Sequence, residues 1–562
     1  MTDNEILAQL LFQNISRTPE DYMQQYPARD LPQDARVTRF APSPTGFLHI
    51  GGLFAALVSQ RTAAVTNGVF YVRIEDTDKK REVEDGVSEI IRGLNAFGIK
   101  IEEGVTGFGQ ETGAYGPYQQ SRRKEIYQAF AKRLVEQGMA YPCFCDADRL
   151  NHIRAEQESK NLNRGYYGEW AVCRSLTLEQ IKEKIAQGMP YVLRLRSPGN
   201  PEKRIVFDDF IKGKIEMPEN DQDVVLLKTD GIPTYHFAHA VDDTLMHTTH
   251  VVRGDEWIAS VPLHIQLFRA IGAKPPKYAH ISPIMKIDGE DGGKRKLSKR
   301  KDPEAAVTYY AEQGYPKEAV MEYLLSIANS NYEDWRKANP LEPWEKFPFN
   351  LKKMSVSGAL FDLVKLNDVS KNVISVMPAE KVLEDTCAWA KEKDTQLYEL
   401  LTADKAYAQE ILTIDRNTKK PRKDIGKWNE VREYLSYFYD ELFQPDYSLP
   451  ENIDPSDAAK ILESYLAVYS AQDDKDQWFA RIKELCEPLG YTPNVKEYKK
   501  DPDAYKGHVG DLSAVIRIAV TGRKNTPDLH SIMKLLGEER TRARLQRALS
   551  YYSGEKKDEW KN

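Results

Sequence analysis

The sequence has few cysteines and no long apolar run. Its 562 residues include five cysteines, an odd and scattered set that gives no disulfide framework. Its longest uncharged apolar stretches, such as LFAALV at 53–58, are far shorter than the roughly 20 residues that a membrane-spanning helix needs. The first residues, MTDNEILAQLLFQN, have neither a basic start nor a small-residue cleavage site. These absences predict a cytoplasmic protein that does not cross a membrane.

A strong net charge is also missing. The formal net charge of −6 argues against a general nucleic-acid coat, but it is compatible with local basic strips on an acidic body. The hydrophobic fraction of 41% is ordinary for globular proteins. At roughly 150 residues per domain, the chain has room for about three or four domains.

Two common phosphate-binding motifs are absent, but a third pattern is present. The chain has neither a GxGxxG after a strand nor a GxxxxGKS/T loop. The stretch RFAPSPTGFLHIGG at 39–52 instead leads from a strand through two prolines into a helix that begins at HIGG. Phosphate is attracted to the free N–H groups and dipole of a helix start, where His49 adds a donor and Gly51 and Gly52 permit close approach. HIGG alone is more typical of a plain helix cap.

Alternating strands and helices predict the fold of the first third. VTRFA at 37–41 and VFYVRI at 69–74 have the pattern of strands, and LFAALVSQRTAAV at 53–65 and VSEIIRGLNAFGI at 87–99 that of helices. This order is typical of a parallel α/β sheet. From about 118 to 227 the alternation loosens, which indicates an inserted domain, and TYHFAHAVDD and HVVRGDEW at 234–257 are interpreted as strands that resume the sheet. Beyond about residue 300 nearly every periodic segment is helical.

A lysine-rich segment is a second candidate for phosphate binding, in addition to HIGG. GEDGGKRKLSKRKD at 289–302 places Lys296 and Lys299 in a glycine-flanked loop, from which their ammonium groups can reach a triphosphate. Alone, this segment is equally typical of a solvated basic run or a localisation signal. HIGG near the start of a sheet, followed much later by KLSKR, however, resembles the phosphate-binding pair of the class I aminoacyl-tRNA synthetases.

Further motifs resemble the bacterial type of glutamyl-tRNA synthetase. They are VRIEDTD at 72–78, TDGIPTYHFAHAVDD at 229–243 and HVVRGDEWIAS at 250–260, in addition to RFAPSPTGFLHIGG. The resemblance implies an α/β fold: a Rossmann-like class I catalytic core with an α+β insertion, followed by an all-α C-terminal half. The implied parts are an N-terminal extension (1–35), the two halves of the catalytic core (36–117 and 228–290), an inserted acceptor-end-binding domain (118–227), the KLSKR loop with a helical stem-contact region (291–372) and an α-helical anticodon-binding body (373–562).

The resemblance also implies a glutamate pocket. Glutamate carries two carboxylates and one ammonium group, so a selective pocket needs arginines and a carboxylate. The implied residues are Arg39, Ser43, Glu75, Tyr235, His239 and Arg253. The two arginines and the tyrosine are expected to hold the side-chain carboxylate, and the serine and glutamate to read the α-carboxylate and α-ammonium groups. At position 239 the family often has asparagine instead of histidine. The alternative for Arg39 and Glu75 is that they pair with each other as charges at strand ends.

The implied reaction needs no covalent enzyme intermediate. The α-carboxylate of glutamate attacks the α-phosphate of ATP, and the terminal ribose hydroxyl of tRNA(Glu) then attacks the mixed anhydride. ATP, which carries Mg²⁺, is expected to bind at His49, Gly51, Gly52, Lys296 and Lys299. Of these, His49, Lys296 and Lys299 are the expected catalytic residues, because they stabilise charge on the phosphates.

Basic strips in the helical half are candidate contacts to tRNA. They are TKKPRKDIGKW at 418–428 and the series Arg540, Arg542, Arg544 and Arg547. A solvated helix face is the commoner explanation for each strip. No obligate protein partner is expected, and a monomer is the family default.

Two other functions compete with tRNA glutamylation. A glutamyl transferase that acts on a modified anticodon base resembles only the catalytic part, and the long helical half of this chain disfavours it. A catalytically inactive RNA-binding relative is disfavoured by the intact HIGG and KLSKR motifs.

Two patterns raise the question of a bound metal. Asp76 and Asp78 follow a strand, and an N-cap of a helix is the favoured interpretation over a carboxylate metal site.

The second pattern is the pair Cys143 and Cys145 of YPCFC, with Cys173 further on, which resembles a zinc knuckle found in some family members. Structural zinc usually takes four Cys or His ligands, but Ser175 stands where those members often have histidine. The other nearby candidates, which match no common ligand set, are His152, Tyr166 and Tyr167. The sequence therefore predicts three ordinary thiols and no tightly bound zinc.

Overall fold

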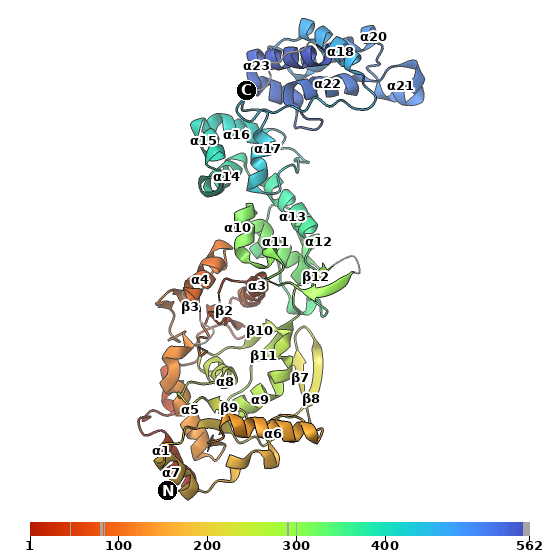
Figure 1. Cartoon of the computed structure of the whole chain (residues 1–562). Coiled ribbons are helices and arrows are strands. Elements are labelled where there is room, and N and C mark those ends of the chain that lie inside the picture. The colour runs from red at the N-terminus through yellow and green to blue at the C-terminus, as the bar shows by residue number, and fades with distance from the viewer. Residues whose placement is uncertain (45, 79–82, 84, 289–291, 299, 555–562) are drawn as a thin grey trace. The chain divides into compact units, whose positions relative to one another are not determined.

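A computed structural model of the chain describes residues 1–44, 46–78, 83, 85–288, 292–298 and 300–554. It contains two compact units, one formed by residues 1–310 and 320–363 and the other by residues 311–319 and 364–562. Figure 1 shows the helices and strands of each.

Parallel strands form the centre of the first unit. β1 (Val37–Phe40) pairs with β2 (Val69–Val72), and β2 pairs with β3 (Glu103–Gly107), whose other edge carries the antiparallel β4 (Gln110–Thr112). β10 (His250–Gly254) pairs in parallel with β11 (Lys277–Ile281). Val37 and Thr249 join β1 to the start of β10 through bonds of 2.8 and 3.0 Å. The resulting order β3-β2-β1-β10-β11 is that of a Rossmann-like sheet, as expected, with the reversal between β1 and β10.

Four helices of the core connect these strands: α3 (Ile50–Ala64), α4 (Gly86–Ala96), α8 (Tyr235–Leu245) and α9 (Val261–Ala270). The strand interpretation of TYHFAHAVDD is wrong, because this segment forms α8. Eight of its eleven residues are buried, including His239, Asp242 and Asp243. A helix that is buried on nearly every side, with polar residues among the buried ones, shows no clear 3.6-residue period.

The inserted region contributes to two different sheets. β5 (Ala140–Cys143), β6 (Val192–Leu195) and β9 (Val225–Leu227) form a sheet of their own, accompanied by α5 (Lys124–Glu136), α6 (Ala147–Ser159) and α7 (Leu178–Ala186). β7 (Arg204–Asp209) and β8 (Gly213–Pro218) form a hairpin that instead extends the core sheet beyond β11. Asp209 at the end of β7 therefore lies opposite Tyr278 of β11.

The N-terminal extension is part of the first unit. Its helices α1 (Asp3–Leu11) and α2 (Pro19–Gln25) pack on α5. Arg29 forms a bidentate pair with Glu103 of β3 at 2.7 and 3.0 Å, and its Nε donates to the carbonyl of Met246. The extension thus ties α5 to the base of the core sheet.

The chain is helical after the hairpin of β12 (Met285–Asp288) and β13 (Gly293–Lys296). No strand follows β13 among residues 297, 298 and 300–554, which confirms the all-α prediction. The later helices are α10 (Val307–Gln313), α11 (Lys317–Ala328), α12 (Tyr332–Ala338), α13 (Leu363–Val376), α14 (Ala379–Lys393), α15 (Thr395–Ala403), α16 (Lys405–Thr413), α17 (Val431–Leu435), α18 (Pro455–Val468), α19 (Lys475–Glu484), α20 (Cys486–Leu489), α21 (Val495–Lys500), α22 (Val509–Thr521) and α23 (Leu529–Tyr552). Ile461, Val515 and Ile532 belong to the core of the second unit. Of the helices that the structure describes, none is long and apolar enough to cross a membrane.

Candidate active site

The expected glutamate-binding residues meet where the core sheet reverses its order. Arg39 lies on β1, Glu75 follows β2, Arg253 lies on β10, and Tyr235 is the first residue of α8. These positions surround the carboxyl ends of β1 and β10, where open α/β sheets bind their ligands. Ser43 lies in the loop after β1 and is exposed.

Arg39 and Glu75 have different ion-pair partners. Arg39 donates from Nε to Asp243 at 3.2 Å, and Glu75 pairs with the fully buried Arg73 at 3.1 Å. Arg73 also binds Asp243, at 2.6 Å. Burial by itself raises the pKa of Asp243, but Arg39 and Arg73 bring it well below its ordinary value. The interpretation of Arg39 and Glu75 as a pair of strand-end charges is therefore wrong.

Arg253 is a buried cation with neutral neighbours. Its Nε donates to His280 Nε2 at 3.0 Å, one terminal nitrogen lies 3.1 Å from His264 Nδ1, and the other lies 3.4 Å from the hydroxyl of Tyr235. Its guanidinium stacks on Tyr278 at 4.8 Å. Within the described part of the chain no carboxylate forms an ion pair with this side chain, which is 6% exposed. A buried cation without a countercharge is costly, so this position is suited to receive an anion.

His239 joins the two arginine environments. Its Nδ1 lies 2.8 Å from Asp243 Oδ2 without the angle of a hydrogen bond, and its Nε2 is 3.1 Å from the Tyr278 hydroxyl. Burial lowers the pKa of His239 to about 3, so the ring is neutral at physiological pH. Its ring therefore contacts protein groups that surround Arg39 and Arg253.

The HIGG motif begins α3 as expected. His49 is the N-cap, and its Nδ1 accepts the Gly51 N–H at 2.9 Å. A neutral His49 ring therefore carries its proton on Nε2, where it can be donated to a phosphate. A Cβ on Gly52 would lie 2.9 Å from Leu48 Cδ1, so a larger residue here would displace the Leu48 side chain.

A buried carboxylate binds the described residues Arg295 and Ser298 of the lysine-rich segment. Asp302 is 1% exposed, receives both terminal nitrogens of Arg295 at 2.5 and 2.7 Å, and accepts the Ser298 N–H at 2.9 Å. Lys296, the last residue of β13, is exposed. Lys299 lies outside the described residues.

The chain after KLSKR lies against HIGG. Ala306 forms a bridge with His49, and the Val307 N–H donates to the carbonyl of Leu48 at 3.2 Å. The segment that follows KLSKR therefore lies beside the start of α3, although the two are far apart in sequence.

Asp76 does not cap the helix that follows it. Its carboxylate accepts the Ser121 N–H at 2.8 Å and the Ser121 hydroxyl at 2.5 Å, at the start of a 3₁₀ turn (Gln120–Arg123). The N-cap of α4 is Asp85, which makes no side-chain capping bond. The prediction that Asp76 is the N-cap of the following helix is therefore wrong, because its hydrogen-bond partner lies in a distant segment.

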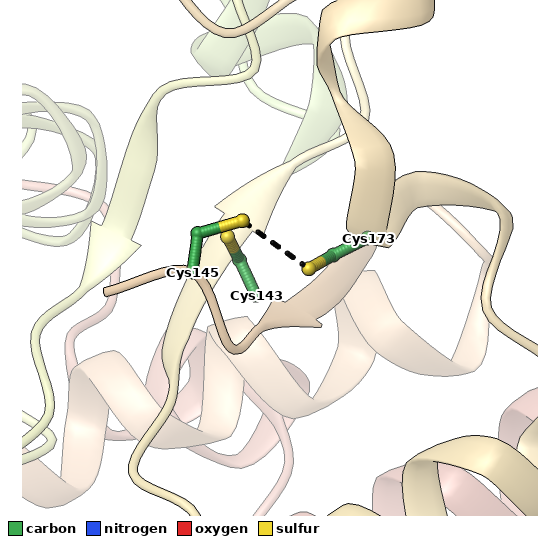
Figure 2. A group of neighbouring side chains, drawn as sticks. All are labelled: Cys143, Cys145 and Cys173. Atoms are coloured by element: carbon green, nitrogen blue, oxygen red, sulfur yellow. Dashed lines mark hydrogen bonds between the residues drawn. The ribbon is translucent and has the colours of Figure 1, made fainter. Parts of the chain in front are cut away.

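Three cysteines of the insertion lie together (Figure 2). The sulfur atoms of Cys143, Cys145 and Cys173 all lie within 4.8 Å of one another, and Cys145 Sγ is 3.6 Å from Cys173 Sγ. The Tyr166 hydroxyl is 3.3 Å from Cys145 Sγ and accepts the Cys173 N–H at 3.0 Å. His152 lies on α6 and is exposed. Three sulfurs and one phenol oxygen thus form a four-donor cluster.

The two basic strips differ in their surroundings. Arg544 is buried and donates to the carbonyls of Tyr437 and Val520 at 2.5 and 3.1 Å. Arg540 and Arg542 also bind backbone carbonyls, so these arginines hold α23 against its neighbours. Arg544 therefore belongs to neither an RNA contact nor a solvated face, because helical spacing does not distinguish a buried face from a solvated one. The other strip presents Lys419, Lys420 and Lys423, which are all exposed.

Comparison with known proteins identifies close similarities along nearly the whole chain. The family described as tRNA synthetases class I (E and Q), catalytic domain, matches residues 36–368, and an anticodon binding domain matches residues 502–549. The chain is 52% identical to a glutamate–tRNA ligase of Clostridium perfringens (strain SM101), over 97% of this chain and 99% of that protein. It is 47% identical to one of Sorangium cellulosum, over 95% of this chain and 98% of that protein.

Solved structures agree with these matches. A crystal structure of a glutamate tRNA ligase from Elizabethkingia meningosepticum, in complex with its amino acid, superimposes with a TM-score of 0.73. The two chains are 27% identical, and the match covers 92% of this chain and 99% of that one. A glutamate–tRNA synthetase from Elizabethkingia anophelis gives a TM-score of 0.71 at 26% identity, over 92% of this chain and 100% of that one.

Proposed function

This chain belongs to the class I tRNA synthetases of the glutamate and glutamine type, and from that premise we propose that it is a glutamate–tRNA ligase. It activates L-glutamate with ATP to glutamyl-adenylate and transfers the glutamate to the 3′ terminal adenosine of tRNA(Glu).

The buried charge of Arg253 is the observation that best supports glutamate as the amino acid. Its polar neighbours are two histidines, a tyrosine hydroxyl and a backbone carbonyl, all neutral. A substrate carboxylate supplies the missing negative charge, whereas the amide of glutamine leaves the cation uncompensated. Arg39 already pairs with Asp243, which also binds Arg73, so we assign Arg39 to complete the pocket beside Tyr235. Ser43 and Glu75 are assigned to the α-carboxylate and α-ammonium groups of glutamate.

The phosphate motifs are assigned to ATP. His49, Gly51 and Gly52 form the start of α3, which accepts the phosphates of ATP, and Mg²⁺ accompanies the nucleotide. Lys296 and Lys299 neutralise the negative charge that develops on the transferring and leaving phosphates. The bridge between Ala306 and His49 supports this assignment, because it places the chain after KLSKR beside the helix start.

The cysteine cluster fits a structural zinc ion better than its sequence indicates. Sequence predicts no zinc because Ser175 replaces a histidine, but Tyr166 supplies a fourth donor beside Cys143, Cys145 and Cys173. Zinc at these four donors would tie the end of β5 to the turn that carries Cys173. No step of the reaction passes through this site.

The partner is tRNA, and the exposed lysines of the 418–428 strip are the preferred contact in the second unit. The cytoplasm is the proposed compartment, consistent with five cysteines that form no disulfide. A monomer without an obligate protein partner is the proposed state.

Pyrophosphate exchange tests the proposed activation step. The purified chain is expected to exchange pyrophosphate into ATP only when glutamate is present, with tRNA(Glu) tested as an additional requirement. Arg253→Gln is expected to weaken glutamate use far more than tRNA binding, because it removes the cation that the carboxylate requires. Equal losses for both substrates would assign Arg253 to the fold instead of the pocket.

A further inference from the structure

Arg253 is oriented by a chain of buried side chains that the reaction itself does not use. Its Nε donates to His280 Nε2 at 3.0 Å, and His280 Nδ1 lies 2.7 Å from Asp209 Oδ2. His280 is 0% and Asp209 is 4% exposed. From β7 to β10 the order of the side-chain groups is therefore carboxylate, imidazole and guanidinium.

The protonation of His280 follows from its neighbours. A guanidinium has only donors, so His280 Nε2 must accept the bond from Arg253 and cannot carry a proton. The ring proton is then on Nδ1 and is donated to Asp209. The Arg253 cation and the Asp209 anion thus select one neutral tautomer and hold the ring in one orientation.

Asp209 is itself held firmly. Its Oδ1 accepts the backbone N–H groups of Ile211 and Lys212 at 2.9 and 2.8 Å, and its Oδ2 accepts the backbone N–H of His280 at 3.0 Å. These bonds, with His280 beside it, keep the pKa of Asp209 below its ordinary value although burial opposes this. The carboxylate is therefore charged and fixed at the end of β7.

Two further histidines, His264 and His236, form a second chain of hydrogen bonds on the other side of the guanidinium. A terminal nitrogen of Arg253 donates to His264 Nδ1 at 3.1 Å, so the His264 proton is on Nε2, from which it is donated to His236 Nδ1 at 2.9 Å. The rings of His264 and His236 are both neutral in this arrangement, and each accepts a hydrogen bond at Nδ1. Arg253 is consequently fixed at Nε and at one terminal nitrogen without any loss of its charge.

We propose that Asp209 and His280 are positioning residues for glutamate: they fix the Arg253 guanidinium in the orientation that receives the substrate carboxylate. This inference rests on the proposed role of Arg253. Because Asp209 belongs to the hairpin that the inserted region adds to the core sheet, this region supplies part of the amino-acid pocket as well as its own sheet.

Substitutions at His280 give a matched test. His280→Asn removes the acceptor for Arg253, and the loss of one hydrogen bond to a charged group is expected to raise the KM for glutamate about 10- to 100-fold. The KM for ATP is expected to stay within about twofold, because the phosphate motifs are untouched. His280→Gln has an amide oxygen that can replace Nε2, so it should restore most of the glutamate affinity.

His250→Gln serves as the control. His250 is a buried histidine on the same strand as Arg253, but it bonds to Thr249 and lies outside this chain of contacts. Its KM for glutamate is expected to equal that of the unaltered protein. Thermal midpoints of all variants show whether each is folded.

A double-mutant cycle tests whether His280 acts on glutamate binding through Arg253. If His280 acts through Arg253, His280→Asn adds no further rise in the glutamate KM once Arg253→Gln is present. Additive effects, or equal rises in the KM values for glutamate and ATP, would overturn the positioning role. If Arg253→Gln alone leaves the glutamate KM unchanged, the proposed role of Arg253 fails instead.

Discussion

At the scale of the residue, the pocket separates two arginines that look equivalent in the sequence. Arg39 shares the Asp243 carboxylate, whereas Arg253 has only neutral hydrogen-bonding partners. The sequence motifs include both arginines and Asp243. They do not indicate that Asp243 pairs with Arg39, which lies 204 residues away in the sequence. That pairing depends on the placement of α8 beside β1. His280 and Asp209 were not identified, because a histidine in an apolar strand and an acidic residue before a turn have no distinctive pattern.

Asp302 offers a residue-scale test of the lysine-rich segment. Asp302→Asn removes the charge that holds both terminal nitrogens of Arg295, so the chain that carries Lys296 loses its fixed geometry. We expect the rate of glutamate activation to fall about tenfold or more, since misplaced catalytic groups lose most of their effect, with the KM for glutamate unchanged.

The matched control is Asp288→Asn. Asp288 binds the Nε of the same arginine at 2.7 Å, but its side chain is 53% exposed. Exposed ion pairs contribute little, so this variant should retain nearly full activity. Equal effects of the two substitutions would show that Asp302 has no special role.

At the scale of the element, the sequence predicts segments whose burial follows a simple period. β1, α3, β2 and α4 lie within one to three residues of their expected positions, because each has one buried face or a buried run. α8 was missed because polar residues are buried inside it, and the β7–β8 hairpin was missed because its sheet partner, β11, lies far along the chain. Arg544 was misassigned because helical spacing does not tell which side of α23 is covered.

Metal analysis tests the turn and strand that carry the cysteines. We expect about one zinc ion per chain in the purified protein, because three sulfurs and the Tyr166 oxygen supply the four donors that structural zinc needs. Cys145→Ser is expected to lose the metal and to lower the thermal midpoint, while Cys387→Ser, which alters a half-buried cysteine of α14, should retain it. A metal-free protein whose insertion survives a chelator would support the original prediction of three ordinary thiols.

At the scale of the whole molecule, the first unit buries several neutral histidines. Burial lowers the pKa values of His236 and His250 to about 4 and that of His239 to about 3, compared with about 6.5 in the unfolded chain. Below pH 6.5 the unfolded chain therefore binds protons that the folded unit does not. Stability is fully present above that pH and is lost progressively as the pH falls towards 4.

Thermal unfolding between pH 7 and pH 5 checks this consequence. Each such histidine is expected to reduce the free energy of unfolding by about 1.4 kcal/mol per pH unit in the acidic part of this range. His250→Gln should make the dependence shallower by about one proton. A midpoint that is independent of pH across the range would contradict the neutral, buried state of these rings.

The most direct test of the proposed activity is the transfer of labelled glutamate to a tRNA(Glu) transcript that contains no modified bases. A glutamate–tRNA ligase should attach glutamate to this transcript in the presence of ATP and Mg²⁺, and the product should fail to form when the terminal ribose is blocked. Attachment only to tRNA with a modified anticodon base, or no attachment at all, would contradict the account.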